Sequence, residues 1–543
     1  MIDGRVAIGA QRAPLPRVAG VIGAGTMGAG IAQLAVQAGM RTVLYDPAPD
    51  ARDRGVAQIT AAIERSRERR RLTAQQAADA IELLQPVAEI SALAACEIAI
   101  EAAPERIELK VELLHSLDAA LDPACVIATN TSSLSVSELG TALTDPGRLV
   151  GMHFFNPAPV MRLVEVIAGT GSSPAAVATA RAVGEAMGKQ VIDAADVPGF
   201  VVNRCNRPYS LEALRLLQAR VATVEQIDRV ARMAAGFRMG PFELIDLIGL
   251  DTNHAVAETF YRQTYGEPRY QPSALQARNI AAGRLGRKTQ IGWYDYRAGH
   301  AGCPPDPDVP AGVAGAGRRV RVIGELPVAR QLRERLTQAG FATDDDGEPW
   351  LTLDCASADT KGHAGGDLYV AADRRARAPT TAGPRAVLVA RGSLHTIDPH
   401  AAGFHLLPPV ATARLVEITS TTLTDPVARH RLETLVVAIG CVAEHVNDAV
   451  GLVLGRIVCQ LINEAAFLIG EGNGSPADVD TGMELGVNHP RGPVAWSREI
   501  GIAHVVAVLD GLHRETGEER YRVAPLLRRG AAVGASGLGD AAG

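Results

Sequence analysis

Short apolar runs alternate with longer amphipathic stretches through the first 200 residues of the chain. The run RVAGVI at 17–22 predicts a buried strand, TMGAGIAQLAVQAG has helical periodicity and stops at Gly39, and RTVLYD at 41–46 predicts a second strand. Further strands are expected at 96–103, 125–133, 148–157 and 190–195. Because strands alternate with helices, we expect an α/β fold of Rossmann type, a doubly wound parallel sheet that binds ligands beyond the carboxyl ends of its strands.

The turn after the first predicted strand carries a glycine pattern typical of dinucleotide binding. Gly23, Gly25 and Gly28 follow the spacing G-x-G-x-x-G. The first glycine permits a tight turn, the second lets a pyrophosphate approach the backbone, and the third lets helix pack on strand. The phosphates would lie at the helix N-terminus, where free N–H groups favour anions. Asp46, 18 residues after Gly28, would bind the ribose hydroxyls and repel a 2′-phosphate, which favours NAD over NADP.

Composition narrows the classes of protein to consider. The 543 residues are 47% apolar and 21% charged, with a net charge of −6, which predicts roughly three or four globular domains and no general role on nucleic acids or membranes. No apolar run approaches the length of a membrane span, and the first residues lack a secretory signal pattern. The seven scattered cysteines, without CxxC, are typical of reduced thiols in a cytoplasmic protein and indicate no metal site.

Polar residues gather where the predicted strands end, in the segments EAAPE, NTSS and HFFNP. His153 and Glu165 lie 12 residues apart with Pro159 at the midpoint, so a chain reversal at NPAP would place them opposite each other. A histidine suits removal of a proton from an alcohol near neutral pH, and a carboxylate on its other ring nitrogen would fix its tautomer. Ser132 and Asn203 would donate hydrogen bonds to the reacting oxygen or to a neighbouring carbonyl. Each residue alone has an ordinary structural explanation, but beside a dinucleotide site they indicate a dehydrogenase.

Six motifs between about residues 17 and 296 resemble a known enzyme family. They are GAGTMGAGIA, TNTSSLSVSEL, GMHFFNPAPVMRLVEVI, DVPGFVVNRCNRPYSLEA, GFRMGPFELIDLIGLD and GRLGRKTQIGWYDY. Together they resemble the NAD-dependent L-3-hydroxyacyl-CoA dehydrogenases. The resemblance implies oxidation of an L-3-hydroxyacyl-CoA to the 3-ketoacyl-CoA with hydride transfer to NAD. It also implies His153 as the base, Glu165 as its partner, and Ser132 and Asn203 as ligands of the substrate oxygen.

The resemblance further implies contacts to the cofactor and to coenzyme A. The implied NAD-binding residues are Gly23, Gly25, Thr26, Met27, Gly28, Asp46, Glu105, Lys110, Asn130, Asn156 and Lys288. The segment IERSRERRRLT at 63–73 carries five arginines, and such a run on a helix is usually a solvated face. Family members have a helical hairpin here, at about 50–95 in this chain, that reaches the CoA phosphates. This implies acyl-CoA contacts from Arg67, Arg69, Arg70 and Arg71.

A second, altered copy of this half begins near residue 318, after a linker at 297–317 that is rich in Gly, Pro and Ala. The segment RVRVIGELPVARQLRERLTQAG matches the opening segment at an offset of 301. Leu326 and Ala329 replace two of the three glycines, and a leucine side chain would stand where the pyrophosphate must approach. No acid equivalent to Asp46 is clear, so we expect no dinucleotide site in this copy.

The later part of the copy matches at a smaller offset of 252. There His405 and Glu417 align with the histidine and glutamate of the first copy, whereas Gly455 replaces the asparagine. The fall in offset from 301 to 252 means that about 49 residues are absent, including the basic hairpin. We interpret His405 and Glu417 as marks of ancestry and expect no second active site. We expect the second helical domain to take the place of a partner subunit, with a homodimer as the other arrangement.

These patterns predict a chain of five segments. They are an NAD-binding domain at 17–197, a helical domain at 198–296, a linker at 297–317, a degenerate Rossmann-like lobe at 318–442 and a second helical domain at 443–536. This organisation resembles the family branch that contains the 3-hydroxyadipyl-CoA dehydrogenase of phenylacetate breakdown. A terminal carboxylate on the substrate would need a basic partner, for which Arg162, Arg207 and Arg238 are candidates.

Three alternatives stay open at this point. In the first, the chain is a 3-hydroxybutyryl-CoA dehydrogenase, which is a closely related enzyme with a shorter acyl substrate. A dehydrogenase of small hydroxy acids or sugar phosphates shares the nucleotide lobe but gives no reason for HFFNPAPVMRLVEV or for the basic hairpin. A catalytically silent NAD-binding structural protein is the third, and the intact set of polar site residues argues against it.

Overall fold

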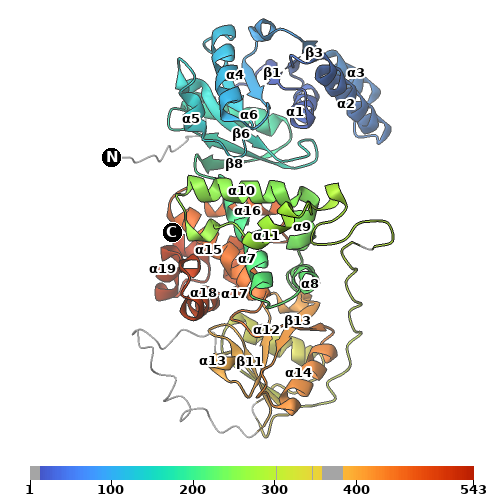
Figure 1. The fold of residues 1–543 in the computed structure, drawn as a ribbon, viewed down its shortest axis with the longest axis vertical. Coiled ribbons are helices and arrows are strands. Elements are labelled where there is room, and N and C mark those ends of the chain that lie inside the picture. The colour runs from blue at the N-terminus through green and yellow to red at the C-terminus, as the bar shows by residue number, and fades with distance from the viewer. Residues whose placement is uncertain (1–12, 301, 345, 357–382, 543) are drawn as a thin grey trace. The chain divides into compact units, whose positions relative to one another are not determined.

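The computed structural model describes residues 13–300, 302–344, 346–356 and 383–542 (Figure 1). Its backbone contacts divide the chain into two compact units. The first unit runs to Arg204 and also contains 472–487, and the second contains 205–471 and the residues from Asn488 onward. A piece of the C-terminal half therefore belongs to the same unit as the amino-terminal sheet.

An eight-stranded sheet forms the centre of the first unit, in the order β3-β2-β1-β4-β5-β6-β7-β8. Its strands are β1 (Val18–Ile22), β2 (Arg41–Tyr45), β3 (Leu84–Val87), β4 (Ile98–Glu101), β5 (Val126–Thr129), β6 (Leu149–Phe154), β7 (Leu163–Ala168) and β8 (Gln190–Ala195). Neighbouring strands are parallel except β6 and β7, which are antiparallel. The predicted Rossmann-type fold is confirmed, and the sheet is mixed because the chain reverses between β6 and β7.

Helices connect these strands and cover the sheet. They are α1 (Thr26–Gln37), α2 (Pro49–Glu68), α3 (Ala74–Glu82), α4 (Ile107–Ala120), α5 (Val136–Gly140) and α6 (Pro174–Ala186). Helices α2 and α3 pack on each other and on α1, and so form the expected hairpin between β2 and β3 (Figure 1). Thr73 begins α3 with a reciprocal capping box to Gln76, which fixes the turn of the hairpin.

Helix α16 (Pro476–Gly486) belongs to the first unit although it comes late in the chain. It packs against β7 and β8. Its glycines permit a close approach, because a Cβ added at Gly482 would lie 2.9 Å from Val202 Cγ2, and one at Gly486 would lie 2.8 Å from Leu163 Cδ2. A helix of the second copy thus covers the sheet of the first.

Two sets of helices lie in the second unit. The earlier set is α7 (Val202–Gln218), α8 (Val224–Ala235), α9 (Pro241–Ile248), α10 (Leu250–Gln263) and α11 (Ala274–Ala281). The first residues of α7 still belong to the first unit. The later set is α15 (Leu454–Gly470), α17 (Pro493–Ile500), α18 (Ile502–Thr516), α19 (Pro525–Val533) and α20 (Leu538–Ala542). Buried carboxylates join them. Glu212 of α7 accepts hydrogen bonds from Arg456 Nη2 at 2.6 Å and Tyr521 Oη at 2.8 Å. Glu464 of α15 accepts one from Tyr270 Oη at 2.5 Å.

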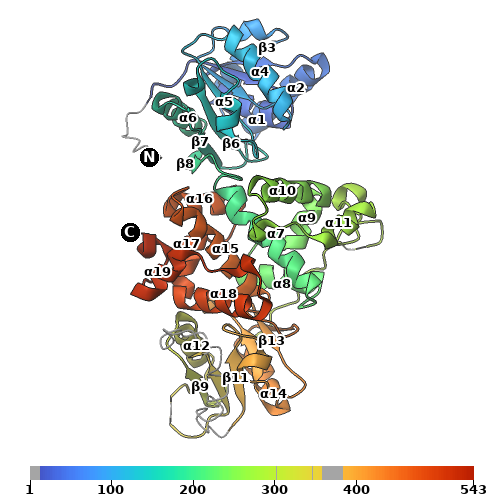
Figure 2. The ribbon, with the colours of Figure 1, turned by 60° about the vertical axis from the view of Figure 1, so that its left-hand side comes forward.

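A smaller sheet of six strands completes the second unit, in the order β14-β13-β12-β11-β10-β9 (Figure 2). Its elements are β9 (Val320–Ile323), α12 (Pro327–Gln338), β10 (Leu351–Asp354), β11 (Arg385–Leu388), α13 (Leu394–Ile397), β12 (Ala402–His405), β13 (Leu415–Thr419), α14 (Pro426–Ala438) and β14 (Val442–His445). Here α12 leads directly to β10, whereas the first copy inserts β2, α2, α3 and β3 at this point. The predicted deletion therefore removed β3 and the basic hairpin, and it reduced the counterpart of β2 to a single parallel bridge between Arg319 and Ala342.

Helix α8 has the same relation to the smaller sheet as α16 has to the larger one. It packs against β13, the counterpart of β7, and Arg229 Nη1 of α8 lies 2.7 Å from Glu444 Oε2. Gln226 Nε2 donates to the other oxygen of Glu444 at 2.9 Å. Because α8 and α16 begin 252 residues apart, each copy contributes the equivalent helix to the sheet of the other.

The described residues contain no helix that is both long and apolar enough to cross a bilayer. They also contain no group of three or more His, Cys, Asp or Glu residues that would hold a metal ion. All seven cysteines fall within the described ranges and are free thiols, and six of them are buried.

Candidate active site

The glycine loop after β1 has the geometry that a bound dinucleotide requires. Gly23 adopts a φ of +102°, which only glycine takes up readily. A Cβ added at Gly28 would lie 1.8 Å from the carbonyl oxygen of Gly23, so helix α1 can pack this closely on β1 only without a side chain there. A Cβ at Gly25 would meet no atom within 4 Å. The backbone at Gly25 is therefore open to a ligand at the N-terminus of α1.

Asp46, directly after β2, is tied to this loop by its own hydrogen bonds. Its Oδ2 accepts from the Ala24 N–H at 2.8 Å, and its Oδ1 accepts from the Ala48 N–H at 2.9 Å. The carboxylate is thus held beside the glycine turn at the edge where β1 and β2 end. Open glycine backbone, a helix N-terminus and an acid at the next strand end together fit NAD.

Lys110 and Glu101 form a buried ion pair behind this edge. Lys110 Nζ lies 2.6 Å from Glu101 Oε1 and 3.4 Å from Glu105 Oε2, and the side chains of Lys110 and Glu101 are 1% and 0% exposed. Thr129 Oγ1 donates to the second oxygen of Glu101 at 2.6 Å. The pair connects α4 with the ends of β4 and β5. The predicted contact of Lys110 with NAD stays a prediction, since its ammonium is engaged by carboxylates here.

Glu105 organises the loop that contains Ser132. Its Oε1 accepts hydrogen bonds from Thr131 Oγ1 at 2.7 Å, the Ser132 N–H at 2.8 Å and Ser133 Oγ at 2.9 Å. Ser132 Oγ lies 3.3 Å from the same oxygen. Burial raises the pKa of Glu105, but the Lys110 ammonium and these hydrogen bonds outweigh burial and lower it below its usual value. An ionised Glu105 therefore fixes the serine loop at the end of β5.

The remaining implied cofactor residues of the first unit lie at the same edge of the sheet. Asn130 follows β5, and its Oδ1 accepts the Phe154 N–H at 2.8 Å, which joins the ends of β5 and β6. Asn156 follows β6 and is exposed, and Thr26 and Met27 occupy the first turn of α1. Because the carboxyl ends of parallel strands meet at one edge, these residues belong to one ligand-binding edge.

His153 and Glu165 form a direct, buried hydrogen-bonded pair. They face each other across the antiparallel strands β6 and β7, as the predicted reversal at NPAP requires. His153 Nδ1 lies 2.6 Å from Glu165 Oε2, and the two side chains are 8% and 0% exposed. The rings of Phe155 and Phe200 lie 4.6 and 5.8 Å from the imidazole. This contact engages Nδ1 with the carboxylate and leaves Nε2 as the ring nitrogen that is not bound to Glu165.

The other oxygen of Glu165 binds the start of helix α7. Its Oε1 accepts the N–H groups of Val201 and Val202, both at 3.0 Å. A helix N-terminus favours a carboxylate, so the start of α7 holds Glu165 in its orientation toward the imidazole. Asn203 follows as the second residue of α7, so the same helix end that anchors Glu165 also carries the predicted substrate ligand.

The basic cluster lies at the turn of the α2–α3 hairpin. Arg67, Arg69, Arg70 and Arg71 are all exposed, and Arg67 Nε pairs with Glu64 at 2.6 Å. Lys288 belongs to the second unit and is also exposed, with its Nζ 2.6 Å from Asp251 Oδ2. The contacts of these five cations with CoA and NAD stay predictions.

Comparison with known proteins agrees with this geometry. The sequence model of the 3-hydroxyacyl-CoA dehydrogenase NAD binding domain matches residues 18–197, and that of the C-terminal domain matches 199–296 and again 451–543. The 3-hydroxyadipyl-CoA dehydrogenase of Escherichia coli (strain K12) is 35% identical over 509 residues, which cover 94% of this chain and 96% of that protein. The chain belongs to the 3-hydroxyacyl-CoA dehydrogenase family. It is therefore an NAD-binding enzyme of that family.

Other relatives of this dehydrogenase cover different shares of the chain. A 3-hydroxybutyryl-CoA dehydrogenase of Bradyrhizobium diazoefficiens is 38% identical over 278 residues, 51% of this chain and 94% of that protein. The crystal structure of a 3-hydroxybutyryl-CoA dehydrogenase from Escherichia coli K12 has a TM-score of 0.79 and 33% identity, and covers 96% of this chain and 99% of that one. The full-length likeness extends over both copies.

In the second copy of the dehydrogenase the same histidine and glutamate are arranged differently. His405 and Glu417 lie opposite each other in the register of β12 and β13. However, one oxygen of Glu417 accepts the Val453 N–H at 2.8 Å, and the other accepts the Leu454 N–H at 3.0 Å. Neither ring nitrogen of His405 has a hydrogen-bond partner among the described residues. A Cβ added at Gly455 would lie 2.5 Å from His405 Cε1, so the ring fills the space beside the helix.

The glycine loop of the second copy is closed as the sequence predicts. Leu326 is only 9% exposed and begins α12, and Ala329 in the first turn is fully buried. The Cβ of Ala329 occupies the position that the first copy keeps empty at Gly28. The backbone cradle for a pyrophosphate is therefore missing.

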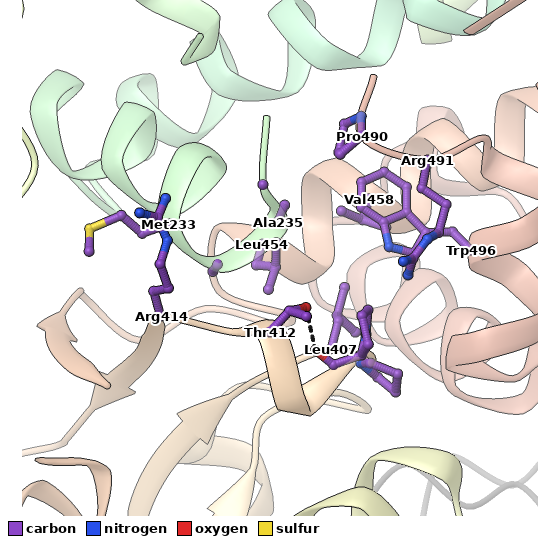
Figure 3. A pocket seen from close by; sticks show the side chains of 14 residues that line it. Met233, Ala235, Leu407, Thr412, Arg414, Leu454, Val458, Pro490, Arg491 and Trp496 are labelled. Atoms are coloured by element: carbon purple, nitrogen blue, oxygen red, sulfur yellow. Dashed lines mark hydrogen bonds between the residues drawn. The ribbon is translucent and has the colours of Figure 1, made fainter. Parts of the chain in front are cut away.

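A cavity of about 170 Å³ lies in the second unit, where α8, the segment 407–414, α15 and the segment 490–496 meet (Figure 3). Its walls combine apolar side chains with polar groups, among them the guanidinium groups of Arg414 and Arg491, and Arg491 pairs with Glu499. Neither His405 nor Glu417 lines it. The cavity therefore has no acid–base pair like that of the first copy.

Proposed function

We propose that this enzyme oxidises the 3-hydroxyl group of an L-3-hydroxyacyl-CoA at the carboxyl edge of the first sheet. The pair of His153 Nδ1 and Glu165 Oε2 at 2.6 Å, in the same unit as the open glycine loop, carries the proposal. NAD, when bound, would accept the hydride that leaves carbon 3 of the substrate. No step needs a metal ion.

His153 acts as the general base. Its Nε2 takes the hydroxyl proton as the carbon–oxygen double bond forms, and Glu165 stabilises the resulting imidazolium through Nδ1. Two backbone N–H groups at the start of α7 hold Glu165 in this orientation. The pair is buried, so the positive charge develops in a site of low polarity where the carboxylate acts strongly.

Ser132 and Asn203 hold the substrate oxygen. Glu105 fixes the serine loop through bonds to Ser132 and its neighbours, and α7 presents Asn203 beside the N–H groups that bind Glu165. Donors fixed in this way stabilise charge on the oxygen without reorganising during the reaction. The exposed arginines Arg67, Arg69, Arg70 and Arg71 bind the CoA phosphates.

We propose 3-hydroxyadipyl-CoA as the substrate. The support is the 35% identity to a 3-hydroxyadipyl-CoA dehydrogenase that extends over 94% of this chain. The second candidate is 3-hydroxybutyryl-CoA, which is supported by the half-length relative with 38% identity and by the full-length crystal structure of that name. A role in phenylacetate breakdown and a cytoplasmic location stay predictions, as does the expectation that the second helical set replaces a partner subunit.

Steady-state formation of NADH tests this assignment. We expect NAD-dependent turnover with both 3-hydroxyacyl-CoA substrates and a higher kcat/KM for 3-hydroxyadipyl-CoA than for 3-hydroxybutyryl-CoA. The reverse preference would support the second candidate. Tight NAD binding without turnover of either substrate would favour a catalytically silent NAD-binding protein.

A further inference from the structure

Lys189 is a buried lysine beside the chain reversal between β6 and β7. It comes directly before β8, and its exposed fraction is 8%. Its Nζ donates hydrogen bonds to the carbonyl oxygens of Ala158 and Met161, both at 2.6 Å. Within the described part of the chain, this ammonium contacts carbonyl oxygens and no carboxylate. A lysine is seldom buried without a charged partner, because removal of its charge from water is costly.

The two carbonyl groups belong to the reversal, residues 155–162, which brings His153 and Glu165 opposite each other. A turn inside the reversal uses a different carbonyl group. The N–H groups of residues 160 and 161 donate to the carbonyl oxygen of Pro157 at 2.9 and 3.0 Å. Lys189 binds two carbonyl groups that this turn does not use, and so it ties the reversal to the start of β8.

The other side of the reversal packs on the helix that follows the glycine loop. A Cβ added at Gly30 of α1 would lie 2.9 Å from Pro159 Cδ and 3.2 Å from Ala158 Cβ. The N-terminus of the same helix is the expected site of the pyrophosphate. The reversal is therefore held by Lys189 and by the dinucleotide helix, and a shift of the reversal would move His153 relative to the cofactor site.

The charge of Lys189 strengthens its contacts with the reversal. Burial lowers the pKa of its ammonium to about 8, so the side chain is still mostly charged at neutral pH. Hydrogen bonds from a charged donor are stronger than those between neutral groups. A neutral side chain of similar length would leave the two carbonyl groups without this donor.

The second copy provides an internal comparison for this contact. At the offset of 252, the carbonyl groups of Val410 and Ala413 correspond to the two that the lysine binds. Cys441 stands in place of Lys189. A guanidinium takes over the role of the ammonium, because Arg335 Nη1 donates to the carbonyl oxygens of Val410 and Ala413. Both copies thus place a cation on the same two carbonyl groups, although from different elements, which indicates that the reversal depends on it.

The second copy attaches its reversal to the helix in a different way. Arg335 belongs to α12, and at the offset of 301 it corresponds to Leu34 of α1. Gln331 replaces Gly30, and its Oε1 accepts the Val410 N–H at 2.8 Å. The second copy therefore joins helix and reversal through side chains, whereas the first copy uses a glycine contact on one side and a lysine on the other.

From these observations we infer that Lys189 is a positioning residue, whose ammonium fixes the reversal and thereby holds the imidazole of His153 in place for proton transfer. The inference rests on the proposed function, because it requires His153 as the base. Lys189 takes part in no chemical step and acts through the backbone of the reversal.

Single-turnover formation of NADH tests this role, with enzyme and NAD in excess over 3-hydroxyadipyl-CoA or 3-hydroxybutyryl-CoA, whichever the native enzyme oxidises faster. At saturating enzyme the rate constant reports on the folded fraction, so a loss of folded enzyme leaves it unchanged. For Lys189→Met we expect the rate constant to fall by roughly 10- to 100-fold, because a small misplacement of reacting groups is costly. Lys189→Arg, which keeps the charge, should retain more of the native rate constant than Lys189→Gln, which keeps an uncharged donor.

Arg335→Met is the matched control, because it removes the corresponding cation from the second copy. It should lower the thermal stability and leave the single-turnover rate constant at the native value. A native rate constant in Lys189→Met and Lys189→Gln would overturn the inference while the proposed function stands, and Lys189→Gln decides alone if Lys189→Met does not fold. An equal fall in Arg335→Met would also overturn it, because the loss would then follow from destabilisation in general. No turnover by the native enzyme would overturn the proposed function.

Discussion

The two copies of the dehydrogenase unit have the same histidine and glutamate in the same strand register, yet only the first copy joins their side chains by a hydrogen bond. In the first copy one oxygen of Glu165 accepts the N–H groups of Val201 and Val202 where α7 begins, and the other oxygen contacts His153. In the second copy one oxygen of Glu417 accepts the Val453 N–H and the other accepts the Leu454 N–H, and His405 has no hydrogen-bond partner among the described residues. The fold alone thus preserves the strand register, whereas the hydrogen bond between histidine and glutamate also needs a carboxylate oxygen that the helix does not bind.

Burial also sets the charges of the histidine and glutamate in the second copy. In the second copy burial raises the pKa of Glu417 to about 8 and, with His504 nearby, lowers the pKa of His405 well below its usual value. Both groups are therefore neutral near pH 7. In the second copy Gly455 replaces the asparagine, and the His405 ring packs beside this glycine. The asparagine and the base are thus lost together. The comparison indicates that sequence identity at two positions is not sufficient for an active site.

The largest expected effect is a difference in kcat between variants of the two histidines, His153 and His405. His153→Ala should lower kcat by roughly 100- to 10,000-fold, because it removes the base, while NAD affinity stays close to that of the native enzyme. His405→Ala should leave kcat close to the native value and lower only stability, because it opens a cavity in a buried site. Stopped-flow or steady-state formation of NADH measures both. Equal losses of kcat in the two variants would show that the second copy takes part in the reaction.

The glutamates should differ in the same direction by a smaller amount. Glu165→Gln should lower kcat on the order of 100-fold, because an amide cannot stabilise the imidazolium. Glu417→Gln should be nearly silent, since the carboxyl group there is already neutral at pH 7. The pH dependence of kcat for the two variants distinguishes them. A native profile in Glu165→Gln would contradict the role of the pair.

Asp46 has no counterpart in the second copy and should affect only the cofactor. Asp46→Ala should weaken NAD binding by about 10-fold and reduce discrimination against NADP, because the variant loses hydrogen bonds to the ribose and the repulsion of a 2′-phosphate. Fluorescence titration of NADH and NADPH gives both affinities. An unchanged cofactor preference would exclude the ribose contact.

The smallest effect concerns stability against pH in the second copy. His405 and His504 are buried and neutral in the folded state, with the pKa of His504 lowered to about 4, so each contributes stability above pH 6.5 that is lost as the pH falls below that value. Glu417, with a raised pKa, acts in the opposite direction. In His405→Leu the decrease in unfolding free energy between pH 7 and pH 5.5 should be smaller by about 1 kcal/mol. Denaturant unfolding at both pH values measures it, and an unchanged decrease would show that His405 is not buried neutral.

Much of the site could be predicted from local sequence. The glycine spacing, the reversal at NPAP and the shift in offset depend on residues close together in the chain, and the structure shows the open loop, the 2.6 Å pair and the missing hairpin that they indicate. The roles of Ser132 and Asn203 are still predictions.

Other features depend on partners that are distant in sequence. Nothing in the pattern of Lys110 distinguishes a buried ion pair with Glu101 from a cofactor contact. The reciprocal packing of α8 and α16 could not be predicted either, because the apolar face of a helix does not specify which sheet it covers.

Calorimetric titration of NAD into the full chain tests most directly whether the first copy alone is functional. Gly25→Leu provides a sharp comparison, because Gly25 has a φ of −70° and a Cβ there meets no protein atom, so the fold should accept the leucine. We predict one NAD per native chain, no measurable binding in Gly25→Leu, and native binding in Leu326→Ala. Two sites per chain, or a single site that survives Gly25→Leu, would contradict the account.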